Sequence, residues 1–87
     1  MRRDKLSVII DILDVANSGE GVKPTHILYK ANLSYKLLTQ YINMLRKKGL
    51  VKETDINGKK HIKITDKGKL FLSEARKMKR FMESFGL

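Results

Sequence analysis

A polar strip along one predicted helix holds the side chains best suited to recognition chemistry. When residues 34–48 are wound into a helix, the apolar residues gather on one side: Leu37, Leu38, Tyr41, Ile42, Met44 and Leu45. The opposite side carries amide, hydroxyl and cationic groups: Lys36, Thr39, Gln40, Asn43, Arg46 and Lys47. Gln and Asn amides can pair with two atoms of an adenine edge, and Arg and Lys bind phosphate oxygens. Because a helix fits the major groove of B-DNA, which is about 12 Å wide, the strip predicts a surface that binds duplex DNA.

Four further residues flank this strip as candidate phosphate contacts: Ser34, Tyr35, Lys59 and Lys60. The first two stand at the start of the predicted helix, where free backbone N–H groups also attract anions. The two lysines follow Asn57-Gly58, a pair typical of tight hairpin turns, and give the hairpin a basic tip. Plainer interpretations stay open, in which the lysines only solvate a loop and Tyr35 packs on Leu38.

The distribution of charge favours a polyanionic partner. The 87 residues carry nineteen Lys and Arg against nine Asp and Glu, a net charge of +10. Residues 34–87 hold fourteen of the basic and five of the acidic side chains, so nearly all of the excess lies there. Such an excess opposes compaction by self-repulsion. We therefore expect an anionic macromolecule as the partner.

Residue types for other chemistry are scarce. The sequence has no cysteine, and its two histidines, His26 and His61, have no companions at metal-ligand spacing. It has no glycine-rich phosphate loop, and a domain of this size leaves little room for a substrate pocket. We expect no enzymatic activity, metal, cofactor or small-molecule ligand.

The elements that must position the strip follow from periodicity and turn residues. The sequence predicts three helices, then a two-stranded hairpin and a last helix, at residues 4–17, 24–31, 34–48, 50–65 and 66–85. A helix-turn-helix followed at once by a hairpin is a winged helix-turn-helix. We therefore predict one domain over residues 1–87, of the α+β class but mainly α.

Two apolar surfaces predict a homodimer. In the last helix, a heptad-like seam has successive spacings of four and three residues: Phe71, Ala75, Met78, Met82 and Phe85. Packing of this helix on its own domain is the alternative. The first helix is apolar over more than half of its circumference, so its flank with Val8, Ile12 and Val15 is also expected to meet a second subunit.

Residues 25–51 resemble the core of archaeal winged-helix regulators, most clearly in the segments 31–35 and 49–51. Residues 64–68 match the entry into the last helix of the archaeal ten-kilodalton DNA-binding proteins that are associated with chromatin, and the similarity to that family extends over nearly the whole chain. The resemblance implies a winged helix, duplex DNA binding and dimerisation through the C-terminal helix. That family's last helix forms a long antiparallel coiled coil, whereas the helix predicted here is short.

Other functions of the same fold also fit parts of the sequence. Some winged helices bind RNA or other proteins, although a basic third helix does not favour protein binding and duplex RNA hides its major groove. The last helix has a Lys/Arg face and a Phe/Met face, so binding to a membrane surface is a further alternative. No apolar run predicts a membrane span or a signal peptide. We expect a cytoplasmic, nucleoid-associated protein.

Overall fold

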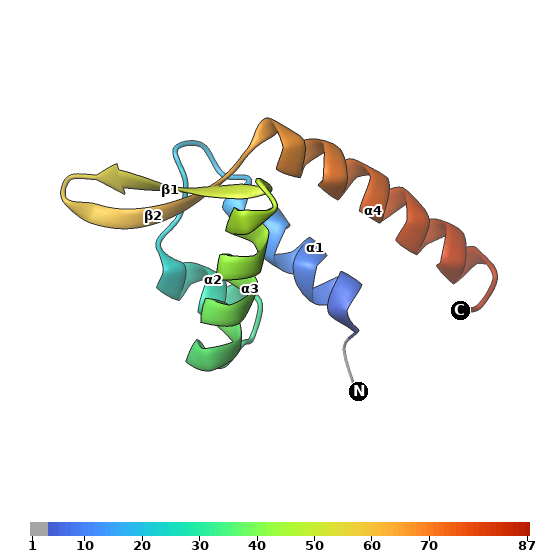
Figure 1. Ribbon diagram of the computed structural model, residues 1–87. Helices are drawn as coiled ribbons and strands as arrows, with labels where there is room; N and C mark the ends of the chain where they lie inside the picture. The colour runs from blue at the N-terminus through green and yellow to red at the C-terminus, as the bar shows by residue number, and fades with distance from the viewer. Residues whose placement is uncertain (1–3) are drawn as a thin grey trace.

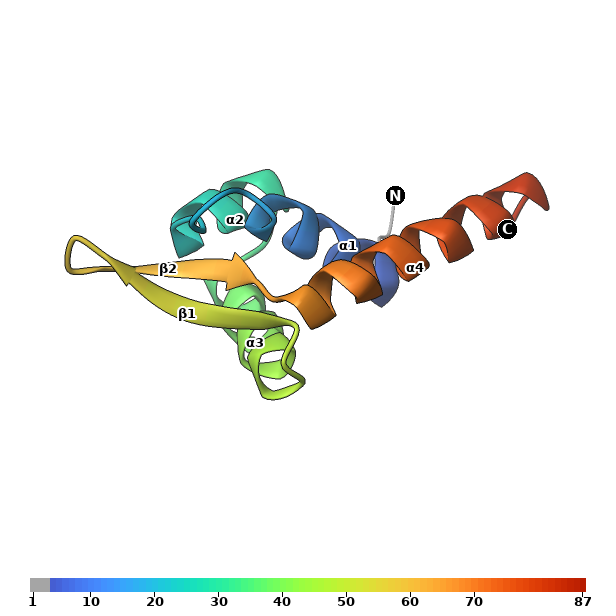
Figure 2. The same cartoon turned by 90° about the horizontal axis from the view of Figure 1, so that it is seen from above.

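The computed structural model describes residues 4–87 and contains four helices and a two-stranded sheet (Figure 1). In chain order the elements are α1 (Lys5–Ala16), α2 (Pro24–Lys30), α3 (Tyr35–Lys47), β1 (Val51–Ile56), β2 (Lys59–Ile64) and α4 (Asp66–Ser84). The hairpin of β1 and β2 and the helix α4 leave the three-helix body in opposite directions (Figure 2). The winged helix-turn-helix architecture predicted from the sequence is confirmed.

The helix α1 lies at the centre of the core. Ile12, Leu13 and Ala16 have no solvent exposure, because α2, β2 and α4 all pack on this helix. The Asp4 carboxylate caps its start by accepting a hydrogen bond from the Ser7 N–H at 2.7 Å. That hydrogen bond to the ionised form holds the pKa of Asp4 below its usual value.

Several apolar residues are placed differently from the predictions. The expectation that one flank of α1 meets a second subunit is wrong: Val8 and Ile12 are buried within their own chain, and Val15 packs against the same core. The elements α2, β2 and α4 surround α1 and bury more of its circumference than is usual for a surface helix. Leu37, predicted on the packed side of α3, is 44% exposed. The core stripe of α3 is narrow, with buried residues only at Leu38, Ile42 and Leu45.

The two strands form the wing, with a two-residue turn at its tip. Asn57 and Gly58 have φ values of 54° and 77°, the positive values that a tight hairpin turn requires at both central positions. The Asp55 carboxylate accepts a hydrogen bond from the Gly58 N–H at 2.8 Å. In the antiparallel register Val51 lies opposite Ile64 and Glu53 lies opposite Ile62, which puts these side chains on the face of the wing that packs on the helices.

A third strand-like segment, which the sequence patterns did not reveal, is joined to the wing at Val22. Its N–H donates to the Ile62 carbonyl at 2.9 Å, and the Ile62 N–H donates back to its carbonyl at 2.7 Å. Gly21 stands beside this bridge with φ at 114°, and a Cβ there would lie 2.9 Å from the Ile62 carbonyl oxygen. A single paired residue has no alternating pattern, so hydrophobic periodicity could not predict it.

A hydroxyl group joins the turn after α3 to the start of α4. Thr65 caps α4 by accepting a hydrogen bond from the Gly68 N–H at 2.9 Å, and it donates to the Gly49 carbonyl at 2.6 Å. Gly68 allows close packing at this junction, because a Cβ there would collide with the Leu50 carbonyl oxygen. Further along, Arg76 of α4 forms an ion pair with Asp14 of α1.

Candidate nucleic-acid interface

The helix α3 presents the predicted polar strip to solvent. Ser34 caps the helix by accepting a hydrogen bond from the Leu37 N–H at 3.2 Å, which sets where its first turn begins. Burial of Leu38, Ile42 and Leu45 against the core then fixes the rotation of the helix. All six residues of the strip are exposed: Lys36, Thr39, Gln40, Asn43, Arg46 and Lys47.

Hydrogen bonds within the helix hold some of the polar side chains of α3. The Thr39 hydroxyl donates to the Tyr35 carbonyl at 3.0 Å, and the Arg46 Nη2 donates to the Asn43 Oδ1 at 3.4 Å. Tyr35 itself is 74% exposed, so its ring is not packed away beside Leu38. These side chains remain exposed to a ligand that approaches α3 from solvent.

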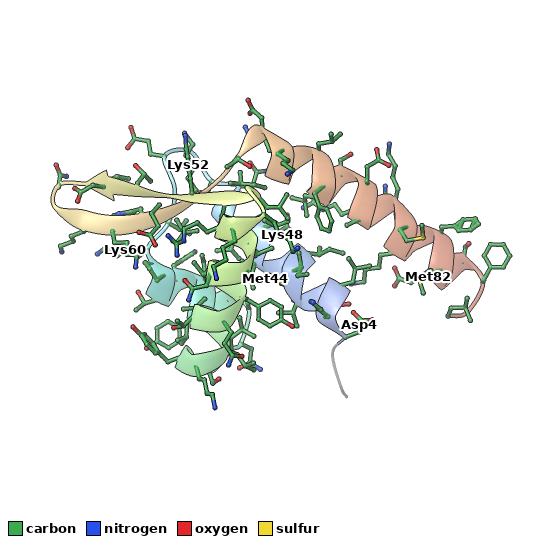
Figure 3. The ribbon with its side chains drawn as sticks, in the orientation of Figure 1. Asp4, Met44, Lys48, Lys52, Lys60 and Met82 are labelled. Atoms are coloured by element: carbon green, nitrogen blue, oxygen red, sulfur yellow. The ribbon has the colours of Figure 1, made fainter. Side chains whose placement is uncertain are left out.

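A shallow groove separates α3 from the wing. It has a volume of about 160 Å³ and is lined by Pro24, Tyr35, Leu38, Thr39, Ile42, Asn43, Glu53, Lys60 and Ile62. Lys60 lies on the side of the wing that faces the helices, whereas Lys52 points to the opposite side (Figure 3). Lys59 also belongs to that opposite side, because neighbouring strand residues alternate. Of the two wing lysines predicted as phosphate contacts, only Lys60 lines the groove beside α3.

The structure adds one residue to this surface that sequence reasoning missed. The Glu53 carboxylate, on β1, lies 3.9 Å from the Arg46 Nε and 3.5 Å from the Lys60 Nζ. Sequence patterns do not single out Glu53, because its two basic partners belong to α3 and β2, which are separate elements. Only the register of the wing over α3 brings the three groups together.

The two histidines also come together in space, in a hollow between α2 and β2. His26 and His61 line it with Lys23, Tyr29 and other polar residues. The His61 Nδ1 is 2.9 Å from the Lys59 carbonyl oxygen. Within residues 4–87 no three His, Cys, Asp or Glu side chains are grouped so as to hold a metal ion.

Comparison with known proteins identifies the family. Residues 2–83 match the winged helix-turn-helix family along almost the whole chain. The chain belongs to this family. This winged helix-turn-helix protein is also 31% identical over 83 residues to the uncharacterized protein MJ0287 of Methanocaldococcus jannaschii, a match that covers 95% of this chain and 80% of the relative.

Solved structures with the same winged helix include archaeal DNA-binding proteins. Sso10a-2, a DNA-binding protein from Sulfolobus solfataricus, is similar with a TM-score of 0.83 and 26% identity, over 95% of this chain and 85% of that one. The transcriptional regulator BldR from the same organism matches with a TM-score of 0.82 and 23% identity, over 93% of this chain and 60% of that one. The resemblance to archaeal winged-helix DNA-binding proteins is thus confirmed.

The helix α4 of the winged helix-turn-helix protein has a second exposed surface. Its apolar side chains there lie on one side of the helix: Leu70, Phe71, Met78, Phe81, Met82 and Phe85. They include four of the five predicted seam residues. Ala75, the fifth, is buried in the core of its own chain, and Leu70 is 65% exposed. The helix contacts the core through Gly68, Leu72 and Ala75.

This exposed apolar side continues to the end of the chain. The rings of Phe81 and Phe85 are 4.9 Å apart between centroids. A groove lined in part by Leu6, Lys79 and Met82 opens between the start of α1 and the second half of α4. Among residues 4–87, no helix is both long enough and apolar enough to cross a membrane.

Proposed function

We propose that this winged helix-turn-helix protein binds duplex DNA as a homodimer and acts as a transcription regulator or a chromatin-associated protein. The observation that carries the proposal is the exposed face of α3, which is polar and basic and lies beside a basic wing. Residues 21–52, which include all of α3, contain no acidic residue. The similarity to Sso10a-2, a DNA-binding protein, supports the same function.

In this proposal α3 lies in the major groove and the wing lies along the backbone. Gln40, Asn43 and Thr39 meet base edges, since their amide and hydroxyl groups can donate and accept hydrogen bonds. The phosphate contacts come from the ends of the strip and from the wing: Ser34, Tyr35, Lys36, Arg46, Lys47, Lys59 and Lys60. The protein then acts at the nucleoid, in the cytoplasm, and by binding rather than by catalysis.

The dimer in this proposal forms through the exposed apolar side of α4. Phe71, Met78, Met82 and Phe85 recur at heptad-like spacing, and a second copy of α4 would remove them from water. Figure 2 shows α4 projecting from the body, so a partner helix can approach without displacing the core. A two-fold dimer would present two copies of α3 to one duplex, as winged and other helix-turn-helix dimers do.

Two pairs of substitutions on α3 test the proposal. Gln40→Ala and Asn43→Ala remove uncharged base-reading groups, so with a specific target they lower discrimination among sequences by about 1–3 kcal/mol. Their effect on salt dependence is expected to be small. Lys36→Ala and Arg46→Ala instead weaken binding to every duplex alike, because phosphates are the same in every sequence. Fluorescence anisotropy titrations against several duplexes over a range of salt concentrations measure both effects.

The same titrations separate the roles and the alternatives. If the Gln40 and Asn43 variants bind DNA like the wild type while the Lys36 and Arg46 variants bind it more weakly, the protein is architectural rather than a sequence-specific regulator. Tighter binding to duplex RNA than to duplex DNA at equal salt supports the RNA-binding alternative. If all four substitutions leave DNA binding intact and the fold stable, α3 is not the recognition helix.

A further inference from the structure

Glu53 is placed where it meets the basic groups of two other elements. It lies on β1 opposite Ile62, on the face of the wing that is turned toward α3. The same face carries Val51, Ile62 and Ile64, which are buried. Glu53 stays exposed although it lies opposite the buried Ile62. Glu53 is therefore held over the groove beside α3 instead of being buried or turned outward.

The two ion pairs of Glu53 are loose. Its carboxylate oxygen is 3.9 Å from the Arg46 Nε and 3.5 Å from the Lys60 Nζ, both longer than a good charge-assisted hydrogen bond. The three side chains remain 39%, 47% and 59% exposed for Glu53, Arg46 and Lys60 respectively. Water and salt screen exposed ion pairs of this kind, so another anion can replace the Glu53 carboxylate as the partner of the two cations.

Two acidic residues, Glu53 and Asp55, lie on this face of the wing, and both line a hollow with Lys60. Among the described residues, Glu53 is the one acid that also lines the groove between α3 and the wing. The Asp55 carboxylate serves the hairpin turn through the Gly58 N–H. Glu20 lines a different hollow, with Lys52 and Lys63 on the other side of the wing. The contacts of Glu53 therefore involve two of the cations assigned above to DNA phosphates.

We infer that Glu53 is a built-in competitor for DNA phosphate, which limits the affinity of the protein for every duplex. The inference rests on the proposed function, since it requires α3 and the wing to face DNA. In the free protein the Glu53 carboxylate pairs with Arg46 and Lys60 and partly neutralises their positive charge. When DNA binds, phosphate oxygens take over these cations, and the carboxylate is left beside the backbone with unfavourable repulsion. Because phosphates do not differ between sequences, this cost is the same on all of them, and base contacts then decide a larger share of the choice between sites.

The substitution Glu53→Gln tests this role. It keeps the size of the side chain and its hydrogen-bonding oxygen but removes one negative charge from the surface. One additional effective cation makes the slope of log K against log salt steeper by about one unit. We expect about five- to tenfold tighter binding at about 0.1 M salt, equal on all duplexes, with the two proteins converging toward about 1 M. Glu53→Thr, which suits an exposed strand position, gives a second neutral variant, and thermal unfolding verifies that both fold.

The matched control is Glu74→Gln. It changes the net charge by the same amount, but Glu74 lies on α4 and pairs with Lys77 at 3.2 Å, away from α3 and the wing. This variant is expected to bind DNA like the wild type. Adding Arg46→Gln and Lys60→Gln provides a second check, since the gain from Glu53→Gln must shrink when the cations that it releases are absent.

Each outcome decides the matter. Tighter binding by both neutral Glu53 variants and not by Glu74→Gln supports the inference. An equal gain from the Glu53 and Glu74 variants, a loss on Glu53→Gln, or a gain confined to some duplexes overturns it. If the Lys36 and Arg46 variants weaken DNA binding while Glu53→Gln has no effect, only this inference fails. If the wild type binds no duplex DNA, the proposed function and the inference fail together.

Discussion

Thr65 shows how one hydroxyl group can hold two elements in register. Its Oγ1 accepts from the first turn of α4 and donates to the Gly49 carbonyl, just beyond α3. Gly49 has a φ of 76°, the left-handed conformation that ends a helix and turns the chain toward β1. The hydrogen bond between the hydroxyl and the Gly49 carbonyl is part-buried. If the hydroxyl were removed, water would only poorly replace it as the donor to this carbonyl. Thr65 thus helps to set the angle at which α4 leaves the wing, together with the close packing of Gly68 on the Leu50 carbonyl.

We expect Thr65→Val to destabilise the fold by about 1–3 kcal/mol, because it removes a helix cap and leaves the Gly49 carbonyl without its donor. Thr65→Ser keeps the hydroxyl and serves as the control, with a clearly smaller loss. Chemical denaturation followed by circular dichroism measures both. A Thr65→Val variant as stable as the wild type would show that the hydroxyl makes no net contribution and would contradict the prediction.

At the scale of elements, α4 carries two different surfaces. Gly68, Leu72 and Ala75 pack on the domain, and Arg76 holds the helix to α1 through Asp14. The remaining apolar side, with Met78 and Met82 at its centre, is exposed. Association through an exposed apolar side of a helix is favourable, and the gain in free energy grows with the apolar area that is removed from water.

Replacing both Met78 and Met82 by Glu is expected to give a folded monomer, because two carboxylates would have to be buried at the proposed dimer contact. Sedimentation equilibrium at about micromolar concentration reports the mass, and circular dichroism reports the fold. The control variant Ser73→Glu with Ser84→Glu introduces the same charge at exposed positions elsewhere on α4 and is expected to stay dimeric. A wild-type monomer in the same experiment would refute the dimer.

At the scale of the molecule, shape and charge act together. The protein extends over 47 × 27 × 20 Å, with the wing and α4 at opposite ends of its long axis (Figure 1). The net charge of +10 spreads a positive potential over this surface and favours any polyanion before a specific contact forms. Binding to DNA is then expected to depend strongly on salt, because neutralised phosphates release their counterions.

The double substitution Lys59→Gln with Lys60→Gln measures the contribution of the wing to this dependence. The slope of log K against log salt is expected to become shallower by about one to two units, since each neutralised phosphate contributes about 0.9. The variant Lys69→Gln with Lys77→Gln on α4 loses the same charge and should leave the slope nearly unchanged. An unchanged slope in the wing variant would mean that the wing does not touch the DNA backbone.

The sequence by itself determined the local elements and which side of α3 is polar. Helical periodicity, the Ser34 cap and the turn residues Asn57 and Gly58 act over a few neighbouring residues, so their consequences can be worked out without the fold. The same patterns led to the winged helix-turn-helix architecture. They also nominated the residues for DNA contact, and those assignments remain predictions.

Only the tertiary structure decided which surfaces are covered and which charges meet. The burial of Ile12 and Ala75 depends on how the other elements pack around α1, and the exposure of Leu37 depends on how α3 lies against the core. No periodic pattern contains either. The meeting of Glu53 with Arg46 and Lys60 depends on strand register and on the position of the wing over α3. Such contacts join residues from separate elements, and their geometry follows from the packing of the whole chain, not from the properties of any one segment.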